Sequence, residues 1–540
     1  MSQDQATLQP VALEERLLLG WSFRRWLLAV VALAATVQAI MLASVWTWTF
    51  RNGDAWFYQG QASLNAEGHW FVSPYRYLQW VFQTPSQHPI YVPSASHPPL
   101  TSTLLTFANW MGLTTFREHS IFLSALFVAT VALVAIAIKL TGGPKVALVS
   151  AGLVATSPYL FVNPSTNLAE TAVLLTVALL LVALFRLIEK PGPWRAVLVG
   201  AAAGLGALSR SELAMVVATV VAPTVWFAVK VPWRNRLLLL GAAAIGFVGV
   251  TGPWLIRNQT TFAKSVWFSD QLGITLIEDN CPKTYSGYYM GWQWIACGLV
   301  VNHPQLEALT VLSGDQGVEV GQGANQDLQR WTGRVVAETS DSFTISVNGA
   351  NAAAKLWHNP AGEGQPVPFA LTKATAGQEV VHVGRSVTVE SMLLQPLDES
   401  IADLAYKKVA MAYIKTHKLR ALEVAGIRVL RVWNLYAPKS QVMFDYQSAR
   451  PHVVSWLGLG VYYLSLPLAI VGGLARRRRG LTNAPFIGLI VTASLAVMTT
   501  FANGRYRVEG DLAISILAAF GILELMRRWR RRRTGETSQQ

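Results

Sequence analysis

The sequence is poor in charge and in cysteine. Of its 540 residues, 14% are Asp, Glu, Lys or Arg, whereas soluble domains carry about 25%. Hydrophobic residues make up 52%, and several apolar runs reach the roughly 20 residues that cross a bilayer as a helix. This composition excludes an ordinary soluble enzyme. The two cysteines, Cys281 and Cys297, are too few for a cysteine-rich metal site or a disulfide-dense scaffold.

Other features are also missing. The sequence has no internal repeat and no Gly-rich nucleotide-binding loop. The N-terminal segment, residues 1–25, does not resemble a cleaved signal peptide, because it is polar and acidic ahead of Arg24 and Arg25. We expect it to be a cytoplasmic segment.

The basic residues stand mostly at the ends of apolar runs. A net charge of +14 could indicate nucleic acid, but clusters such as 476–479 and 527–533 directly follow apolar runs. This distribution is typical of the positive-inside rule for membrane proteins. We therefore predict a multi-pass protein of the plasma membrane that contacts membrane lipid and binds no nucleic acid.

The apolar runs predict a polytopic α-helical membrane protein of about 10–12 spans. Basic turns place both termini in the cytoplasm. Residues 100–113 are apolar but short, and we expect a helix that dips into the outer leaflet or lies at the interface. The predicted spans are 26–50, 119–139, 144–161, 167–188, 195–210, 212–231, 236–256, 453–475, 484–501 and 511–526.

The largest polar region, residues 257–452, follows an outward span, so we expect it outside the cytoplasm. Its residues 330–390 alternate apolar and polar side chains, which predicts a small β-rich insert. Cys281 and Cys297 would pair in an oxidising compartment; the alternative is two free thiols. The predicted parts are the transmembrane module 26–256 with its first external loop 51–97, the external region 257–452 with helices at about 398–436, the C-terminal spans 453–527 and the basic tail 528–540.

The first external loop holds an isolated acid, Asp54, soon after the first span. A carboxylate at a partly dehydrated interface can take a proton from a hydroxyl group, so one interpretation is a general base. The alternative is the N-cap of a helix through Trp56 to Gln61. His97 stands before two prolines, and we expect it to orient the loop rather than to bind a metal, because no partner stands at metal-ligand spacing.

Several charged residues fall at the outer ends of the predicted spans. Such residues are costly at membrane depth and usually mark a site, although arginines there can also contact only lipid headgroups. We expect some of them to position a donor or an acceptor in a shared cavity. This positioning set is Tyr58, His97, Glu170, Arg210 and Glu212.

Three arginines are candidates for binding a phosphate group, because a guanidinium fork matches phosphate geometry. Arg505 and Arg507 flank Tyr506 in a turn on the outer side, against the usual charge bias. Arg257 ends the span before the large external region. The alternative roles are headgroup contacts for the pair and an interface anchor for Arg257.

Six short motifs together resemble the GT-C superfamily of integral-membrane glycosyltransferases. The likeness is to the bacterial branch related to protein O-mannosyltransferases and aminoarabinose transferases, and it covers about 20–300 and 398–525. Many relatives have Asp-Glu where this chain has Asp54-Ala55, and the predicted β-rich insert differs from their helical loop. The motifs are GDAWFYQGQA, SHPPL, NLAET, GLGALSRSE, PWLIRN and NGRYRVEGD.

The resemblance implies an inverting transfer of a sugar from a polyprenyl-phosphate donor on the outer face of the membrane. Asp54 would be the base, and Arg257, Arg505 and Arg507 would hold the phosphate. The acceptor would be a cell-envelope glycan, lipid or protein, and no cofactor is expected other than a divalent metal, whose need is left open. The alternatives are a transporter or flippase of lipid-linked sugars and a non-catalytic envelope assembly protein.

Overall fold

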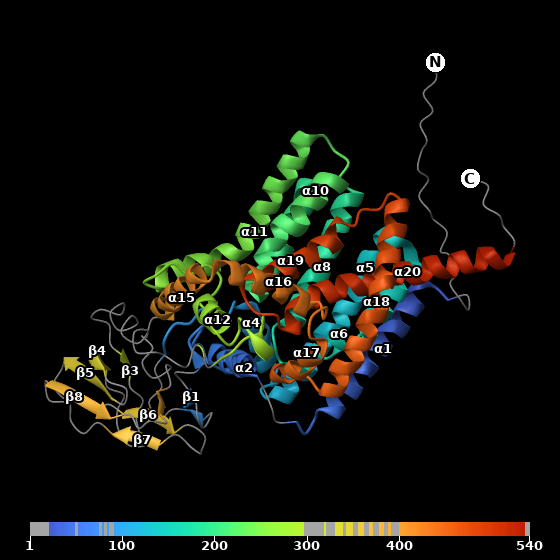
Figure 1. Ribbon diagram of the computed structural model, residues 1–540. Helices are drawn as coiled ribbons and strands as arrows, with labels where there is room; N and C mark the ends of the chain where they lie inside the picture. The colour runs from blue at the N-terminus through green and yellow to red at the C-terminus, as the bar shows by residue number, and fades with distance from the viewer. Residues whose placement is uncertain are drawn as a thin grey trace.

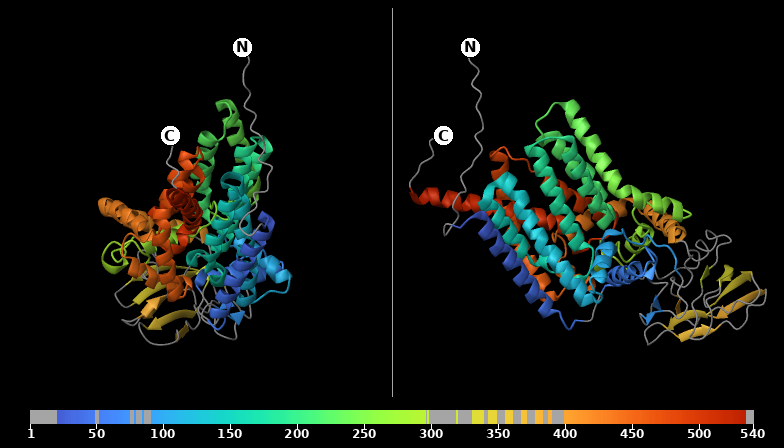
Figure 2. Two further views of the ribbon diagram at one scale, coloured as in Figure 1. Left: turned by 90° about the vertical axis from the view of Figure 1, so that its right-hand side faces the viewer. Right: turned by 180° about the vertical axis from the view of Figure 1, so that it is seen from behind.

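The computed structural model of the chain is a bundle of helices (Figure 1). It describes residues 21–48, 52–74, 91–295, 297 and 399–534, together with the backbone of short strands between these ranges. The end of the bundle that holds α2, α4 and α12 lies away from the C-terminal part of α20 in both figures (Figures 1 and 2). The candidate site lies in that part of the molecule.

The helices of the bundle fall into two groups along the chain. The first group comprises α1 (Phe23–Ser44), α2 (Gly53–Ala66), α4 (Leu100–Trp110), α5 (Phe116–Thr156), α6 (Pro158–Phe161), α7 (Asn163–Thr166), α8 (Glu170–Glu189), α9 (Pro193–Ser209), α10 (Ala222–Ala228), α11 (Trp233–Thr261) and α12 (Leu272–Asp279). The second group comprises α15 (Glu399–Thr416), α16 (Lys418–Val432), α17 (Pro438–Phe444), α18 (His452–Arg478), α19 (Ala484–Thr499) and α20 (Val508–Thr534).

Shorter helical turns connect these helices. They are the 3₁₀ turns η2 (Ser211–Met215), η4 (Gly287–Tyr289), η6 (Asp445–Ser448) and η7 (Gly504–Arg507) and the π turn η3 (Val217–Val221). Because η2, η3 and α10 follow one another, they form one continuous but irregular helical segment.

Six helical segments are long and apolar enough to cross a membrane, so the chain is a multi-pass membrane protein. They are Phe23–Ser44, Phe116–Thr156, Glu170–Glu189, Ser211–Ala228, Trp233–Thr261 and His452–Arg478. The predicted spans 195–210, 484–501 and 511–526 correspond to α9, α19 and α20, which fall outside that set. The total of about 10–12 spans stays a prediction.

The 41-residue helix α5 is broken near its middle. Gly143 has a φ of +79°, which only glycine adopts without strain, and Pro144 follows it. Proline cannot donate the next helical hydrogen bond and clashes with the preceding turn. The break falls between the two predicted spans 119–139 and 144–161, so each keeps its own helical segment.

The helix α2 begins at Gly53 and not near Trp56. Its N-cap is Asn52, whose side chain accepts a hydrogen bond of 2.9 Å from the backbone N–H of Asp54. The alternative that Asp54 is the N-cap is therefore wrong. Asp54 lies in the first helical turn, where the helix dipole favours a negative charge.

Two pairs of long helices touch at the backbone, each through two glycines. In the pair α9 and α11, a Cβ at Gly200 would overlap the carbonyl of Ala243, and one at Gly246 would overlap that of Val197. In the pair α18 and α20, a Cβ added at Gly472 or at Gly521 would likewise overlap a backbone carbonyl of the facing helix. Small residues permit this close packing inside a membrane.

For the strands, the structure describes the backbone alone. They are β1 (Leu78–Gln79), β2 (Thr84–Pro85), β3 (Val318–Glu319), β4 (Arg330–Glu338), β5 (Ser342–Asn348), β6 (Lys355–Pro360), β7 (Val367–Ala370), β8 (Gly377–His382) and β9 (Val387–Val389). The strands pair in the orders β1-β2, β3-β4-β5-β8 and β7-β6-β9. The rest of residues 330–390 lies outside the described residues, so the predicted β-rich insert stays a prediction.

Replacing Gly246 by Val should destabilise the protein, because the added side chain forces α11 away from α9. Overpacking typically costs about 1–3 kcal/mol of unfolding free energy. Gly249→Val in the same helix is the matched control, because no atom lies within 4 Å of its added Cβ. Thermal unfolding in detergent should show a lower midpoint for Gly246→Val only; equal midpoints for both variants would refute the packing argument.

Candidate active site

Five charged side chains from distant parts of the chain form a continuous network. Nη2 of Arg505 lies 2.7 Å from Oδ2 of Asp54, which joins η7 to the first turn of α2. Nε of Arg505 lies 3.9 Å from Oε1 of Glu170, the first residue of α8. Arg210 pairs with the same Glu170 oxygen at 3.0 Å and also with Glu212. The alternating signs hold both arginines and the acid between them, Glu170, in place.

Tyr506 fills the space beside the two arginines. The guanidinium carbon of Arg210 lies 4.0 Å from the centre of its ring, and that of Arg505 lies 5.3 Å away. Both contacts are cation–π interactions. The sequence motif placed Tyr506 between Arg505 and Arg507 but gave no sign of this role, because the contact to Arg210 depends on the fold.

His97 lies on the other side of Asp54, with 3.7 Å between its Nε2 and Oδ1 of the acid. The hydroxyl of Tyr58 lies 3.3 Å from Nδ1 of His97. The amide nitrogen of Gln271, at the start of α12, lies 3.3 Å from Nε2. The sequence predicted His97 and Tyr58 as site residues but gave no sign of Gln271, which belongs to no charged or motif pattern.

The protonation states follow from burial and charge. Burial lowers the pKa of His97 to about 4, against the opposing effect of Asp54, so the ring is neutral at neutral pH. Burial raises the pKa of the Tyr58 phenol well above its usual range, and this group remains a donor.

Asp54 stays ionised. Burial alone would raise its pKa, but the charge of Arg505, helped by His97 and by the Arg505 hydrogen bond, lowers the pKa below its ordinary value of 3.8. Its side chain is 24% exposed, compared with 12% for Arg505 and 1% for Glu170. In the pair of Asp54 and Arg505, Asp54 is therefore the more accessible side chain. It is the one that an incoming hydroxyl group can reach.

Arg257 contacts the first external loop and not the Asp54 network. Its guanidinium donates to the carbonyls of Ser94 at 3.1 Å and Phe71 at 2.9 Å. It also lies against the rings of Trp254 and Phe262. These contacts join α11 to the loop segment that leads to His97.

Arg507 is buried on a different side of η7 from Arg505. Its Nε lies 3.1 Å from Oδ2 of Asp511, and its Nη1 donates to the carbonyl of Val432 at 2.7 Å. The rings of Tyr159 and Tyr462 lie against its guanidinium. Among the described residues its ion pair is with Asp511, so the structure does not bring Arg507 to Asp54.

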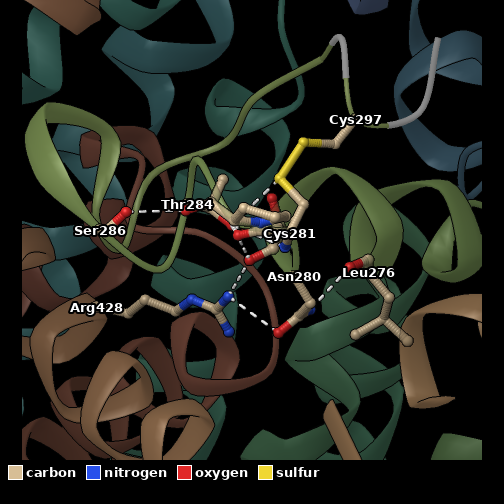
Figure 3. Close-up of a disulfide and its surroundings, with 9 residues drawn as sticks. Leu276, Asn280, Cys281, Thr284, Ser286, Cys297 and Arg428 are labelled. Atoms are coloured by element: carbon tan, nitrogen blue, oxygen red, sulfur yellow. Dashed lines mark hydrogen bonds between the residues drawn. A yellow bond between two sulfur atoms is a disulfide. The ribbon is translucent and has the colours of Figure 1, made fainter. Parts of the chain in front are cut away.

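A disulfide joins Cys281 to Cys297 (Figure 3), which confirms the predicted pairing. The bridge closes the segment that follows α12. Figure 3 shows Arg428 of α16 pointing toward this segment, where it donates to Oδ1 of Asn280 at 3.3 Å and to the carbonyl of Asp279. The disulfide and Arg428 thus both hold the C-terminal end of α12 in place.

No metal site is evident in the part of the chain that the structure describes. Within it, no group of three or more His, Cys, Asp or Glu side chains is arranged to hold a metal ion.

Residues 96–256 match the family described as dolichyl-phosphate-mannose-protein mannosyltransferase. The match begins at the end of the first external loop and ends in α11, so it includes His97, Glu170, Arg210 and Glu212. It confirms the resemblance to the GT-C glycosyltransferases that the motifs predicted. No curated protein sequence matches the chain.

Solved structures of three such enzymes are similar to the chain at low identity. For the oligosaccharyltransferase AglB of Archaeoglobus fulgidus, with an inhibitory peptide and a dolichol-phosphate, identity is 11% and the TM-score 0.45, with 96% of this chain and 52% of that one covered. The present chain thus spans about half the length of AglB. For ArnT of Cupriavidus metallidurans, bound to undecaprenyl phosphate, identity is 12% and the TM-score 0.35, with 92% of this chain and 78% of that one covered. For the Pmt1-Pmt2 complex of S. cerevisiae, bound to the sugar donor, identity is 10% and the TM-score 0.43, with 95% of this chain and 86% of that one covered.

Replacing Arg210 by Gln should destabilise the fold, because it removes the nearer partner of the buried Glu170. Breaking a buried ion pair from one side costs about 3–5 kcal/mol. The double variant Arg210→Gln/Glu170→Gln should recover much of this loss, since the buried charge of Glu170 is removed with its partner and only the partly exposed Glu212 loses its pair. Unfolding midpoints of the three proteins measure the effect; a double variant that is less stable than the single one would contradict it.

Removal of the disulfide should lower the unfolding free energy by about 3 kcal/mol, given the short loop that it closes. The measurement compares the unfolding of wild type with that of Cys281→Ser/Cys297→Ser. Alkylation of the denatured, unreduced wild type is the control and should label no thiol. Two labelled thiols would support the free-thiol alternative instead.

Proposed function

We propose that the protein is a membrane glycosyltransferase that moves a sugar from a polyprenyl-phosphate donor to an acceptor hydroxyl. The observation that carries the proposal is the pairing of an accessible carboxylate, Asp54, with a buried arginine, Arg505, at one end of an apolar helix bundle. A transfer of this kind needs a base for the acceptor and a cation for the leaving phosphate, and this pair supplies both.

The reaction is a single displacement. The acceptor oxygen forms a bond to the anomeric carbon of the sugar while the bond from that carbon to the phosphate oxygen breaks. The electron pair of the broken bond leaves on the phosphate, which is a good leaving group and needs no strong general acid. The acceptor proton moves to the carboxylate of Asp54, and attack opposite the leaving group inverts the configuration.

Arg505 has two roles in this proposal. Its Nη2 holds Asp54 ionised and oriented, and the remaining edge of the guanidinium stabilises the negative charge that develops on the donor phosphate. Glu170 and Arg210 keep Arg505 in place, and His97 lies against Asp54 from the other side. Because the distance between base and cation is fixed, the acceptor and the donor are held in the right relative position. Such positioning supplies a large part of the rate enhancement in catalysis.

Arg257 and Arg507 enter the proposal in supporting roles. Each was a candidate phosphate ligand, but the guanidinium of Arg507 is occupied by Asp511 and the Val432 carbonyl. That of Arg257 bonds the carbonyls of Ser94 and Phe71. Arg257 is expected to position the loop that bears His97, and Arg507 the turn that bears Arg505.

The proposed orientation rests on the charge distribution, and the proposed acceptors rest on the family resemblance. Basic clusters at 476–479 and 527–533 favour the cytoplasmic side for their ends of the bundle. We therefore place Asp54 on the outer face of the plasma membrane, with cell-envelope glycans, lipids or proteins as acceptors.

Asp54→Asn should reduce transfer by about 10²–10⁴-fold, because an amide cannot take the acceptor proton. The assay uses polyprenyl-phosphate mannose as donor and a cell-envelope fraction as acceptor, with the full chain in proteoliposomes. Glu67→Gln is the matched control, since Glu67 is exposed just beyond the end of the same helix. Unchanged transfer by a folded Asp54→Asn protein would refute the base assignment.

The same proteoliposomes separate the alternatives. Donor that crosses the bilayer without loss of its sugar would indicate a flippase, and an absence of both activities would indicate an assembly protein. Release of polyprenyl phosphate in step with acceptor labelling is the result expected for the transferase.

A further inference from the structure

Two asparagines stand in matching positions ahead of the Asp54–Arg505 pair. Asn52 precedes Asp54 by two residues, and Asn503 precedes Arg505 by two. Each is the N-cap of its element, α2 and η7. The side-chain oxygen of Asn52 accepts a hydrogen bond of 2.9 Å from the backbone N–H of Asp54, and that of Asn503 accepts one of 3.1 Å from the backbone N–H of Arg505. Each asparagine therefore fixes the backbone from which one member of the ion pair extends.

The amide nitrogens of the same two side chains meet adjacent residues of η6. Nδ2 of Asn52 donates to the backbone carbonyl of Gln447 at 2.8 Å. Nδ2 of Asn503 donates to the hydroxyl of Ser448 at 3.1 Å. A chain of hydrogen bonds thus runs from the first turn of α2 to η7 through a single peptide bond of η6. The ion pair between the two charged side chains closes this chain into a ring.

The turn η6 is itself anchored to both groups of helices. Arg450, which follows it, donates from Nη2 to Oδ1 of Asn163 in α7 at 2.8 Å. The ring of Tyr446 contacts the rings of Trp48 and of His452 in α18, with 5.7 Å and 5.5 Å between ring centres. The peptide bond that meets the two asparagines therefore has a fixed place in the bundle.

The turn η7 packs directly on η6. A Cβ added at Gly504 would lie 3.1 Å from Oδ1 of Asp445, so glycine permits a close approach at this point. Ser448 is fully buried and Asn503 is 5% exposed. Water does not compete for a hydrogen bond in such a place, and an unpaired amide left there would be costly.

We propose that Asn52 and Asn503 are positioning residues, which act through η6 to set the spacing between the base and the phosphate cation. This inference rests on the proposed transferase reaction. An arginine side chain has several rotatable bonds, so the ion pair alone leaves the two backbones free to shift. The two asparagines remove that freedom by holding Asp54 and Arg505 to one peptide bond. The acceptor on one and the donor phosphate on the other are then held at reacting distance.

The test uses two changes that break the links to η6 and keep both helix caps. Asn52→Ser retains a good N-cap but has no amide to reach the Gln447 carbonyl. Ser448→Ala removes the partner of the Asn503 amide. In the mannose-transfer assay the double variant should lose about 10²-fold in kcat, the loss that a misplacement of about 1 Å can cause, and each single variant should lose less. The donor KM should change little, because Arg505 acts on charge that develops only as the bond breaks.

Two controls separate this effect from a loss of folding. Ser286→Ala removes an exposed hydroxyl that donates to the Pro282 carbonyl at 3.0 Å, and it should keep the wild-type kcat. Unfolding midpoints are measured for every variant. Asn52 is only half-buried, so Asn52→Ser is expected to fold with a wild-type midpoint even where the buried Ser448→Ala does not. Wild-type kcat in a folded double variant would overturn the proposal.

A double-mutant cycle tests whether Asn52 acts through Asp54. In the Asp54→Asn background the base is already lost, so Asn52→Ser should reduce the residual transfer no further. A general structural role of Asn52 would instead lower transfer by the same factor in both backgrounds. Equal factors would therefore contradict the positioning role.

The outcomes distinguish the two proposals. Full activity of Asp54→Asn refutes the transferase mechanism. A strongly impaired Asp54→Asn together with a wild-type kcat for Asn52→Ser/Ser448→Ala overturns only the positioning role of the asparagines.

Discussion

The ion pair between Asp54 and Arg505 is the interaction on which the candidate site depends. It joins the first turn of α2 to η7, two elements from opposite ends of the chain. Its charges lower the pKa of Asp54 and so decide which group can hold a proton. Glu170 and Arg210 extend the pair into an alternating network, which keeps two arginines buried without unpaired charge. The proposed base, the proposed phosphate cation and their spacing all follow from this pair.

Much of this arrangement could be predicted because charge inside a membrane protein is rare. The few charged residues at the outer ends of apolar runs could be identified one by one, and their common side followed from the basic turns. The short helix α4 and the break at Gly143-Pro144 likewise follow from local residue chemistry. The pairing of Cys281 with Cys297 needed only two cysteines in an oxidising compartment.

The rest depends on contacts that no local pattern reveals. Arg505 and Arg507 look equivalent in sequence, but a 3₁₀ turn repeats every three residues, so side chains two apart point in different directions. Gln271 is uncharged and directly precedes an ordinary amphipathic helix. Its relation to His97 arises only when α12 packs beside the first external loop. Sequence reasoning therefore found the charged residues and not the side chains that connect them.

The glycine contacts between α9 and α11, and between α18 and α20, have a consequence for how the proposed lipid-linked donor would reach the candidate site. Helices in backbone contact cannot slide or separate without losing their close packing. Each pair must then move as a rigid block. Any lateral portal for the lipid tail has to open between blocks, where side chains and not backbones meet.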